Sequence, residues 1–414
     1  MPSFSIPLSG LSADSQALNA ISNNLANLNT VGYKDTSMQF KDLFYQQIGS
    51  TGAGEPIAIG AGVTIGSNAG VFTQGSIENS GVHTDMAIQN EGFFVTNKNG
   101  LQEYTRAGNF TKAPNGDLVT QDGANVMGFP AVNGVINAQG AVGPINIPLG
   151  STTPASATAN IQFGINLDAT AAAGTTFNAQ TPIYDSLGAT HVLTITFTKS
   201  ATANTWGYNV TIPGADVGST TPTVPVVLKT GTLTFNSAGQ LTLPAANIGP
   251  VPITGFVNGA ATLNFNWNGI AAPSQTITQF AGASAQGNST QDGFSSGTLT
   301  DFTVDQNGVV QGSFSNGQSR ALAQLALATF GNEEGLNRAG SNSFEATIGS
   351  GAANVGVANT GGKGSIIGGS LELSNVDIAT EFARLIVAQR GYQANAKSVT
   401  TFDQVTQDTI NLKQ

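Results

Sequence analysis

Both ends of the chain carry an apolar repeat of seven residues, whereas the long middle does not. The N-terminal repeat consists of Leu11, Leu18 and Leu25, with Ile21 and Leu28 offset by three positions. The C-terminal repeat consists of Ile378, Leu385, Tyr392 and Val399, widened by Phe382, Ala388, Ala396 and Phe402. Such a repeat is typical of helices that pair along a narrow seam. The sequence therefore predicts two terminal helices, which can meet as a coiled-coil pair.

Proline and glycine set the bounds of the N-terminal helix. Proline is tolerated in the first turn of a helix and breaks its interior, so we expect this helix to start at or after Pro7 and to cover residues 8–30. Asn29 or Gly32 can supply the left-handed residue that ends it. Lys34 is then expected to mark the return of the chain to solvent.

The two predicted helices differ in charge. The C-terminal helix, expected from Asp377 to near Leu412 with Ser374 or Asp377 as its N-cap, carries ordinary charged residues. Residues 1–33, in contrast, contain Asp14 as their only charged side chain. A helix that faces water usually carries charges on its outer face. We therefore expect the N-terminal helix to be surrounded by other protein on nearly every side.

Between the two ends the pattern changes to that of β-strands. Asn-Gly and Asp-Gly pairs recur about every ten residues, as in NKNG (97–100), NGDLVTQDG (115–123) and DQNGVVQGSFSNG (305–317). Closely spaced turns of this kind are typical of all-β folds. HVLTITFTKS (191–200) alternates apolar and polar residues as a half-buried strand does. ALAQLALATF (321–330) fits either a helix or a buried strand.

A change in composition marks an inserted segment. Residues 150–290 contain only five charged residues but nine of the 16 prolines. The fold class predicted is mainly β with α-helical termini, in which an all-β outer domain is inserted into an all-β core domain. The predicted domains are a terminal helical domain (1–45 and 372–414), a linker or extended stretch (46–71), a core domain (72–149 and 291–371) and the outer domain (150–290). Whether the insert is one domain or two stays open.

Charge and composition exclude several classes of protein. Charged residues make up 9% of the chain, against roughly 25% in typical soluble domains. A net charge of −10 argues against a nucleic-acid surface, and no apolar run approaches the length of a membrane span. The first Lys is Lys34, so the basic start of a secretory signal is missing. The absence of cysteine fits either chance or a chain exported unfolded to the outside.

Motifs for catalysis or metal binding are weak. His83 and His191 have no acidic or thiol partners at ligand spacing and are expected to be structural. GAGVTIG (60–66) and TGGKGS (360–365) depart from nucleotide-binding loops at required positions, and NGDLVTQDG lacks the acids of a calcium loop. We therefore predict no catalytic residue, metal or cofactor, and no enzyme activity.

Several motifs resemble those of one known family. SGL (9–11), NNLAN (23–27) and TVGYK (30–34) are similar to the N-terminal signature of the flagellar axial proteins, which are rod, hook and hook-associated subunits. LELSNVDIATEFARLIVAQRGYQANAKSVTTFDQV (371–405) resembles their C-terminal signature. The segments 72–95, 104–110 and 307–336 resemble the core domain of this family. YDSLGATHVLTITF (184–197) and the long insert favour its hook branch over the shorter distal-rod proteins.

The resemblance implies a structural subunit of the bacterial flagellum rather than an enzyme. Many copies would form a curved helical tube, a universal joint that connects the rod to the filament and transmits torque. The expected partners are other copies of the chain, distal-rod and hook–filament junction proteins, the hook cap and the flagellar type III export apparatus. The expected location is extracellular, in the hook, after export without a cleaved signal peptide.

The terminal helices are the expected assembly site. Narrow apolar stripes cannot be buried by one helix alone, so these segments are expected to be disordered in the monomer and to fold on assembly. Leu18, Ile21, Leu25 and Leu28 are expected to face the C-terminal helix. Asn23, Asn24 and Asn27 are expected to bond to neighbouring subunits or to line a neutral channel. The full predicted set is Leu11, Leu18, Ile21, Asn23, Asn24, Leu25, Asn27, Leu28, Ile378, Phe382, Leu385, Tyr392 and Val399.

Two alternative functions stay open at this point. One is an extracellular β-rich adhesin or carbohydrate-binding protein, which the neutral, threonine-rich insert would suit. The other, within the same family, is a distal-rod or hook-associated protein. An adhesin has no need of matched terminal helices, so loss of residues 1–30 should leave its binding intact.

Overall fold

The computed structural model describes residues 4–43, 46–50 and 56–412. The chain forms two compact units, each with its own interior. The helix-bearing unit contains residues 1–148, 301–312 and 319–414, and the inserted unit contains residues 149–300 and 313–318. The finer division into four domains remains a prediction.

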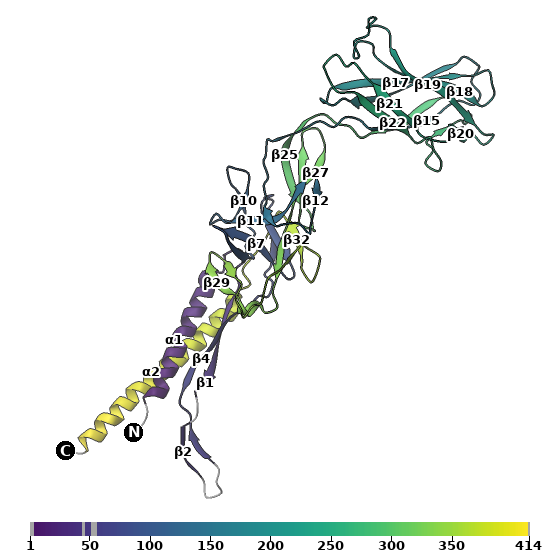
Figure 1. The fold of residues 1–414 in the computed structure, drawn as a ribbon. Helices are drawn as coiled ribbons and strands as arrows, with labels where there is room; N and C mark the ends of the chain where they lie inside the picture. Colours follow the sequence, from purple (N-terminus) through teal and green to yellow (C-terminus); the bar gives the residue numbers. More distant parts are fainter. Residues whose placement is uncertain (1–3, 44–45, 51–55, 413–414) are drawn as a thin grey trace. The chain divides into compact units, whose positions relative to one another are not determined.

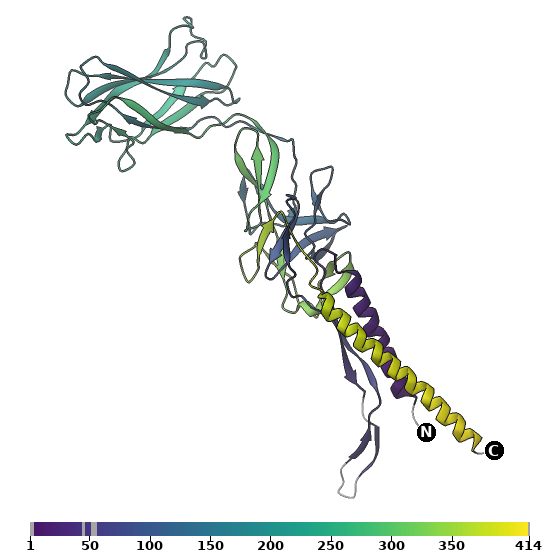
Figure 2. The ribbon, with the colours of Figure 1, turned by 180° about the vertical axis from the view of Figure 1, so that it is seen from behind.

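The two terminal helices lie side by side in the helix-bearing unit, α1 over Ser5–Ala26 and α2 over Ile378–Asn411 (Figures 1 and 2). They run antiparallel, because Phe4 contacts Phe402 near one end and Asn24 bonds to Glu381 near the other. The predicted pair of terminal helices is thus confirmed. Neither helix is long and apolar enough to cross a membrane, as judged over the described residues.

The predicted start of the first helix was wrong. The helix begins at Ser5, two residues before Pro7. The first four N–H groups of a helix have no acceptor within it, so a proline in the first turn costs no hydrogen bond. The predicted end at residue 30 was also wrong: α1 ends at Ala26, its C-cap Asn27 has φ of −100°, and the left-handed Gly32, with φ of +67°, lies in the turn that follows. For α2, the side chain of Asp377 accepts a hydrogen bond from the Thr380 N–H at 2.6 Å, as an N-cap does.

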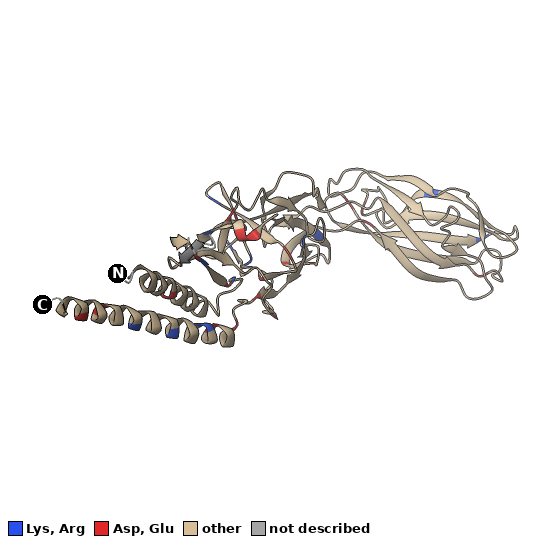
Figure 3. Ribbon diagram, turned by 90° about the horizontal axis from the view of Figure 1, so that it is seen from below, with Lys and Arg blue, Asp and Glu red and all other residues tan. Residues whose placement is uncertain are grey.

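Two pairs of antiparallel strands follow α1, and the second pair lies in the sequence between the two strands of the first. In the first, β1 (Thr36–Asp42) pairs with β4 (Val63–Gly70), and in the second, β2 (Gln46–Ser50) pairs with β3 (Pro56–Ile59). The stretch expected as a linker therefore contains paired strands. α1 packs against both β1 and β4 as well as against α2. Four residues of α1 are buried in the single chain, and much of the rest of its surface is exposed, so the expectation that the chain itself surrounds this helix on nearly every side was wrong. Figure 3 shows how α1 and the more highly charged α2 differ.

The main sheet of the helix-bearing unit surrounds an aromatic cluster of Phe93, Tyr104, Phe129 and Phe344. Its strand order is β27 (Ser319–Leu325), β11 (Asn125–Val132), β7 (Phe93–Lys98), β8 (Leu101–Thr105), β30 (Ser343–Glu345) and β29 (Asn337–Gly340). Short strands join it at β9 (Thr111–Lys112), β10 (Leu118–Val119), β12 (Val135–Ile136), β13 (Gly143–Pro144), β28 (Leu327–Thr329) and β31 (Asn354–Gly356). The ambiguous segment 321–330 is therefore extended, in β27 and β28.

Smaller strand pairs complete this unit. β5 (Ile77–Asn79) pairs with β33 (Ser370–Glu372), and β6 (Met86–Gln89) pairs with β32 (Ser365–Gly368). A single 3-10 turn covers Glu333–Gly335. Two further strands, β25 (Gly297–Val304) and β26 (Val309–Phe314), have residues in both units.

The inserted unit contains two five-stranded sheets around one core. One has the order β21 (Ile248–Ile253), β22 (Leu263–Asn268), β15 (Asn160–Asn166) and β23 (Ile277–Thr278), with β24 (Ala285–Gln291) also paired to β15. The other has the order β16 (Thr176–Tyr184), β17 (Thr190–Lys199), β18 (Thr205–Ile212), β19 (Val226–Phe235) and β20 (Leu241–Leu243). β14 (Thr152–Thr153) pairs with β25. Alternate residues of β17 are buried, as its sequence predicts, together with Trp206 and Trp267.

Candidate assembly site

The seam between α1 and α2 is built from small and polar residues. A Cβ atom placed on Gly10 would lie 2.7 Å from the amide nitrogen of Asn395, so the backbone of α1 lies against that side chain. Asn395 donates a hydrogen bond to Asp14 at 2.8 Å. Gly391 leaves room for the same carboxylate, which would lie 3.0 Å from a Cβ there. Asp14, the one charged residue among positions 1–33, thus accepts a hydrogen bond from the other helix of the pair.

The predicted leucine stripe occupies this seam only in part. Ile21 is buried, whereas Leu11, Leu18, Leu25 and Leu28 are half-buried. On α2, Leu385 and Val399 are half-buried, but Ile378, Phe382 and Tyr392 are 47%, 52% and 38% exposed. The residues of α2 that lie against α1 are Glu381, Ala388 and Asn395 instead, and the predicted role of the three exposed residues in assembly stays a prediction.

The asparagines near the C-terminal end of α1 form hydrogen bonds within the same chain. Asn24 is wholly buried and donates to Asp35, to the Thr36 carbonyl oxygen and to Glu381, while its own oxygen accepts from Tyr33. The expectation that Asn24 bonds to a neighbouring subunit or lines a channel was therefore wrong. Its hydrogen bond to Glu381 connects the C-terminal end of α1 to the start of α2.

The other two asparagines also have partners in the same chain. Asn23 donates to the hydroxyl of Tyr33 at 3.0 Å, and Asn27 donates to the carbonyl oxygen of Asn23 at 2.9 Å. Asn23 remains exposed and Asn27 half-exposed. A further role for these two residues at a surface between copies stays a prediction.

The outer side of α2 presents large apolar side chains to solvent. Phe382, Ile386 and Val387 are 52%, 56% and 71% exposed, and Ile410 near the C-terminal end is 60% exposed. On α1, Leu8 is 58% exposed. We call Phe382, Ile386 and Val387 the outer face of α2. Contiguous exposed apolar residues on a helix typically mark a surface that another protein covers.

A groove of about 670 Å³ lies beside this face, between α1, β1 and α2. Its apolar lining includes Ala17, Ile21, Met38, Val387 and Ala388, and Asp14, Glu381 and Arg384 stand among them. Arg384 is held by Glu381 at 2.6 Å and lies 3.5 Å from Asp35. The groove thus combines apolar walls with charges that are already paired.

A buried ionic cluster joins the ends of the helices to the β-core. Lys34 donates to Glu372 at 2.7 Å and to the Thr73 carbonyl oxygen at 2.7 Å, and the Arg106 Nε lies 3.4 Å from the other oxygen of Glu372. Lys34 and Glu372 are 1% and 0% exposed. The expectation that Lys34 marks the return to solvent was wrong. Burial lowers the pKa of Lys34, the nearby Arg106 adds to this, and Glu372 opposes both.

The sequence offers one signal for this cluster, which is a single carboxylate among apolar residues. Lys34 follows the Gly32 turn, and Glu372 stands between Leu371 and Leu373 in a strand. The pairing itself is not visible in the sequence, because 338 positions separate the two residues. Through this cluster the segment after α1 is fixed to the strand just before α2.

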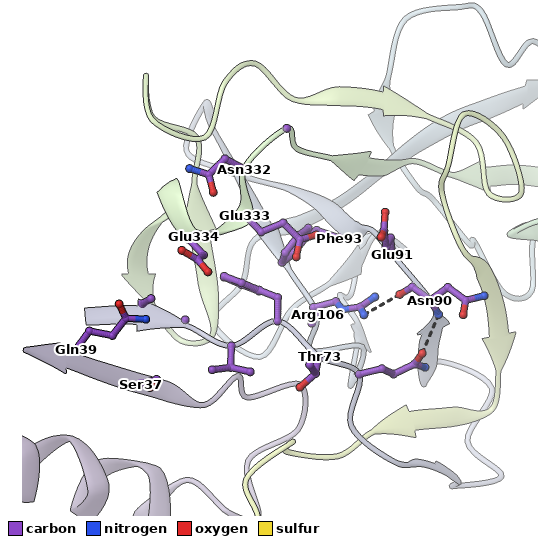
Figure 4. A pocket seen from close by; sticks show the side chains of 16 residues that line it. Ser37, Gln39, Thr73, Asn90, Glu91, Phe93, Arg106, Asn332, Glu333 and Glu334 are labelled. Carbon is purple, nitrogen blue, oxygen red and sulfur yellow. Dashed lines mark hydrogen bonds between the residues drawn. The ribbon is translucent and has the colours of Figure 1, made fainter. Parts of the chain in front are cut away.

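Arg106 also forms a wall of a cleft of about 870 Å³ (Figure 4). Its guanidinium donates to the carbonyl oxygens of Gly92 and Asn90 at 2.9 and 2.8 Å, so it is occupied by the chain itself. Glu91 and Glu333 line the same cleft, and burial raises the pKa of Glu333. The arrangement offers no nucleophile next to a base, and we assign it no chemistry.

Both histidines have acidic partners that were not predicted from the sequence. His83 pairs with Asp301 at 2.8 Å in an exposed position. His191 is buried between Asp216, at 3.0 Å from Nδ1, and Asp185, at 3.2 Å from Nε2. No group of His, Cys, Asp and Glu in the described part of the chain is suited to hold a metal ion. These carboxylates were not predicted, because none of them lies at the sequence spacing of a metal-binding motif.

Lowering the pH is expected to weaken the inserted unit as Asp185 takes up a proton. Burial opposes the charged form, but hydrogen bonds from Asn258, His191 and two backbone N–H groups hold the pKa of Asp185 below its ordinary value. Its stabilising effect is therefore complete above an ordinary pKa of about 3.9 and is lost as pH falls through the lower folded value.

Calorimetry of the full chain from neutral to acidic pH measures this effect. Asp185→Asn should lower the Tm of the inserted unit at neutral pH, and the difference from wild type should shrink in acid. Asp408→Asn, at an exposed position on α2, serves as the control. A difference that stays constant down to the lowest pH reached would contradict the assignment.

Replacement of Gly32 by alanine should destabilise the junction after α1. A Cβ there would lie 2.5 Å from the Ala107 nitrogen, and the residue has a left-handed φ of +67°. Gly81 has nearly the same φ, +68°, with nothing within 4 Å of a Cβ. Both variants should lose about 1–2 kcal/mol from the left-handed backbone, and Gly32→Ala about 1–3 kcal/mol more from overlap. Urea unfolding measures both, and equal losses would contradict the close packing.

Comparisons with known proteins match nearly the whole chain. Four family models match in order: the flagella basal body rod protein (residues 6–34), the flagellar hook protein FlgE/F/G D1 domain (87–168), the flagellar basal body protein FlaE D2 domain (146–294) and the flagellar basal body rod FlgEFG protein C-terminal region (367–412). The third of these lies almost entirely within the inserted unit.

Curated relatives extend the match over nearly full length. The flagellar hook protein FlgE of Treponema pallidum is 34% identical, with 98% of both chains covered. That of Escherichia coli is also 34% identical, with 99% of this chain and 100% of the relative covered. Among solved structures, the Helicobacter pylori flagellar hook protein FlgE2 has a similar fold, with a TM-score of 0.54 and 15% identity over 70% of this chain and 98% of its own. The chain belongs to the flagellar hook protein FlgE family.

Proposed function

We propose that many copies of this chain assemble through their terminal helices into a curved helical tube, the hook, which joins the flagellar rod to the filament. Membership of the hook protein family supports a structural role in the hook. In such a tube the chain works as a universal joint that transmits torque. The full-length similarity to hook proteins does not favour an adhesin or a distal-rod protein.

The observation that carries this proposal is the outer face of α2. Phe382, Ile386 and Val387 stay exposed although α2 is already paired with α1. Among the residues that the structure describes, none covers this face. When one surface patch binds a different patch on the next copy and the rotation does not close, the product is an open helical filament. A second copy therefore supplies the missing cover.

The partners beyond the chain itself follow from this place in the flagellum. Distal-rod proteins would meet the first copies and hook–filament junction proteins the last, with a cap protein at the growing end. Export through the flagellar type III apparatus would bring unfolded chains to that end. The absence of cysteine suits a chain that travels unfolded to the outside of the cell.

The low charge of the inserted unit suits contacts that must exchange as the tube bends. Residues 150–290 contain five charged residues, and the exposed positions of β17 and β18 include Thr, Asn and Val. Neutral hydroxyl and amide contacts reform readily, whereas paired charges fix one arrangement. Pairs of Lys and Glu introduced across neighbouring copies should straighten the tube. Unchanged curvature in electron micrographs would argue against this link.

Deletion of residues 1–30 tests the role of the terminal helices. The deleted chain should remain soluble at concentrations where the full chain sediments, while circular dichroism still shows folded β units. Polymer formed by the deleted chain at the wild-type concentration would overturn the proposal. In cells, the same deletion should prevent both export and hook formation.

A further inference from the structure

The C-terminal end of α2 extends beyond its partner helix. α2 has 34 residues and α1 has 22, and the ring of Phe402 lies 6.1 Å from that of Phe4, just before the start of α1. Residues 403–411 therefore continue past the helix pair, as Figures 1 and 2 show. All of them except Thr406 are exposed. We call residues 403–412 the overhang of α2.

One face of the overhang carries a carboxylate between two apolar side chains. Val405, Asp408 and Leu412 follow one another at three and four positions, so they lie on the same face. Val405 and Leu412 are 49% and 88% exposed. Asp408 lies in the last turn of α2, where the negative end of the helix dipole disfavours a carboxylate, and no basic residue of that turn offsets it. A cation from another chain would relieve this repulsion.

Positive and negative charges are separated along α2, as Figure 3 shows. The middle of the helix carries the exposed Arg390 and Lys397, and the overhang carries two exposed aspartates. Arg390 lies four positions after Ile386, and Lys397 lies seven positions after Arg390, so both continue the outer face of α2. In the described ranges the ion pairs of α2 are those of Arg384 and Glu381, which leaves these other charges unpaired. The outer face is therefore apolar and basic, whereas the overhang is apolar and acidic.

We propose that the overhang of one copy covers the outer face of α2 in a neighbouring copy, with Asp408 placed between Arg390 and Lys397. This inference rests on the proposed polymerisation and names the segment that meets the outer face. Copies in a helical filament are related by rotation and translation along one axis, so their α2 helices run in the same direction along it. The contact then requires neighbouring copies to be shifted by roughly 17–27 Å along the helix, at about 1.5 Å per residue.

Carbodiimide treatment of assembled polymer tests this contact directly, because the reagent joins an amine to a carboxylate that touches it. Mass spectrometry should find Lys397 joined to Asp408 in polymer and not in monomer. Within one chain these two residues are roughly 16 Å apart along the same helix, so the product can only join two copies. Wild-type polymer without this product would contradict the proposed contact.

Reversal of the charge at position 408 tests the same contact by assembly. Asp408→Lys should raise the critical concentration at least about tenfold, because it places like charges against each other. Lysine suits the C-terminal end of a helix, so circular dichroism of the monomer should show no loss of helix. Combination with Arg390→Glu and Lys397→Glu reverses both sides of the contact and should restore assembly.

Asp403→Lys is the matched control on the same overhang. Asp403 lies about 140° around the helix from Asp408, so its reversal should leave the critical concentration within roughly twofold of wild type. Wild-type assembly by Asp408→Lys, with no product between Lys397 and Asp408, would show that tubes form without this contact. A wild-type chain that does not polymerise would contradict the proposed function and the contact together.

Discussion

Replacement of Glu372 by glutamine is expected to lower the free energy of unfolding by about 3–5 kcal/mol. Glu372 is the anion of the buried cluster, and its loss leaves Lys34 and Arg106 as buried cations with no opposite charge. The backbone N–H of Gly75 also loses a charged acceptor at 2.9 Å. Urea or thermal unfolding of the purified monomer measures the loss.

Glu78→Gln provides a matched control for this variant. Glu78 lies in β5 directly opposite Leu371, one residue from Glu372 in the paired strand, and is exposed. Its replacement should change stability by less than about 0.5 kcal/mol, as is usual for surface positions. If both variants lowered the free energy of unfolding by the same small amount, the buried cluster would not stabilise the junction between the helices and the β-core.

Replacement of both Phe382 and Ile386 by serine is expected to weaken assembly strongly without unfolding the monomer. Both side chains are more than half exposed in the single chain, so little packing is lost there. In the polymer, each would lose about 1–2 kcal/mol of apolar burial, and together they should raise the critical concentration at least tenfold. Sedimentation across a concentration series measures the change.

Ala388→Ser serves as the contrasting variant on the same helix. Ala388 is 8% exposed and faces the inside of the helix-bearing unit, so serine there should affect the monomer more than the polymer contact. Wild-type assembly by the Phe382 and Ile386 double variant would exclude the outer face of α2 as a contact between copies.

The sequence predicted the fold class, the terminal helices and the family correctly. Seven-residue periodicity and alternating strands are local patterns, so they survive in a single sequence. The family motifs at both ends and in the core were confirmed by full-length matches to hook proteins. These features depend on neighbouring residues or on long sequence motifs rather than on distant contacts.

The details of the site depended on contacts that no local pattern reveals. Asn24 is buried because it meets Asp35 and Glu381, the latter 357 positions away. Phe382 and Tyr392 follow the apolar repeat but stay exposed, because Glu381, Ala388 and Asn395 are the residues of α2 that lie against α1. The spacing of apolar residues identifies a helix. It does not tell which apolar residues of that helix pack against which other element.

Lys34 shows the same limit for charged residues. A lysine after a glycine turn is most often solvated, and here the distant Glu372 and the Thr73 carbonyl oxygen make its burial possible. Similarly, the carboxylates around His191 come from positions six residues before it and 25 residues after it. Such pairs are set by strand pairing and loop packing, which were not predicted at the level of single residues.

Electron microscopy of the concentrated, purified chain tests the central claim most directly. We expect curved tubes whose innermost layer is formed by α1 and α2, with the outer face of α2 covered by a neighbouring copy in a helical reconstruction. A chain that remains monomeric at high concentration, or tubes in which the terminal helices lie away from the inner wall, would contradict assembly through these helices.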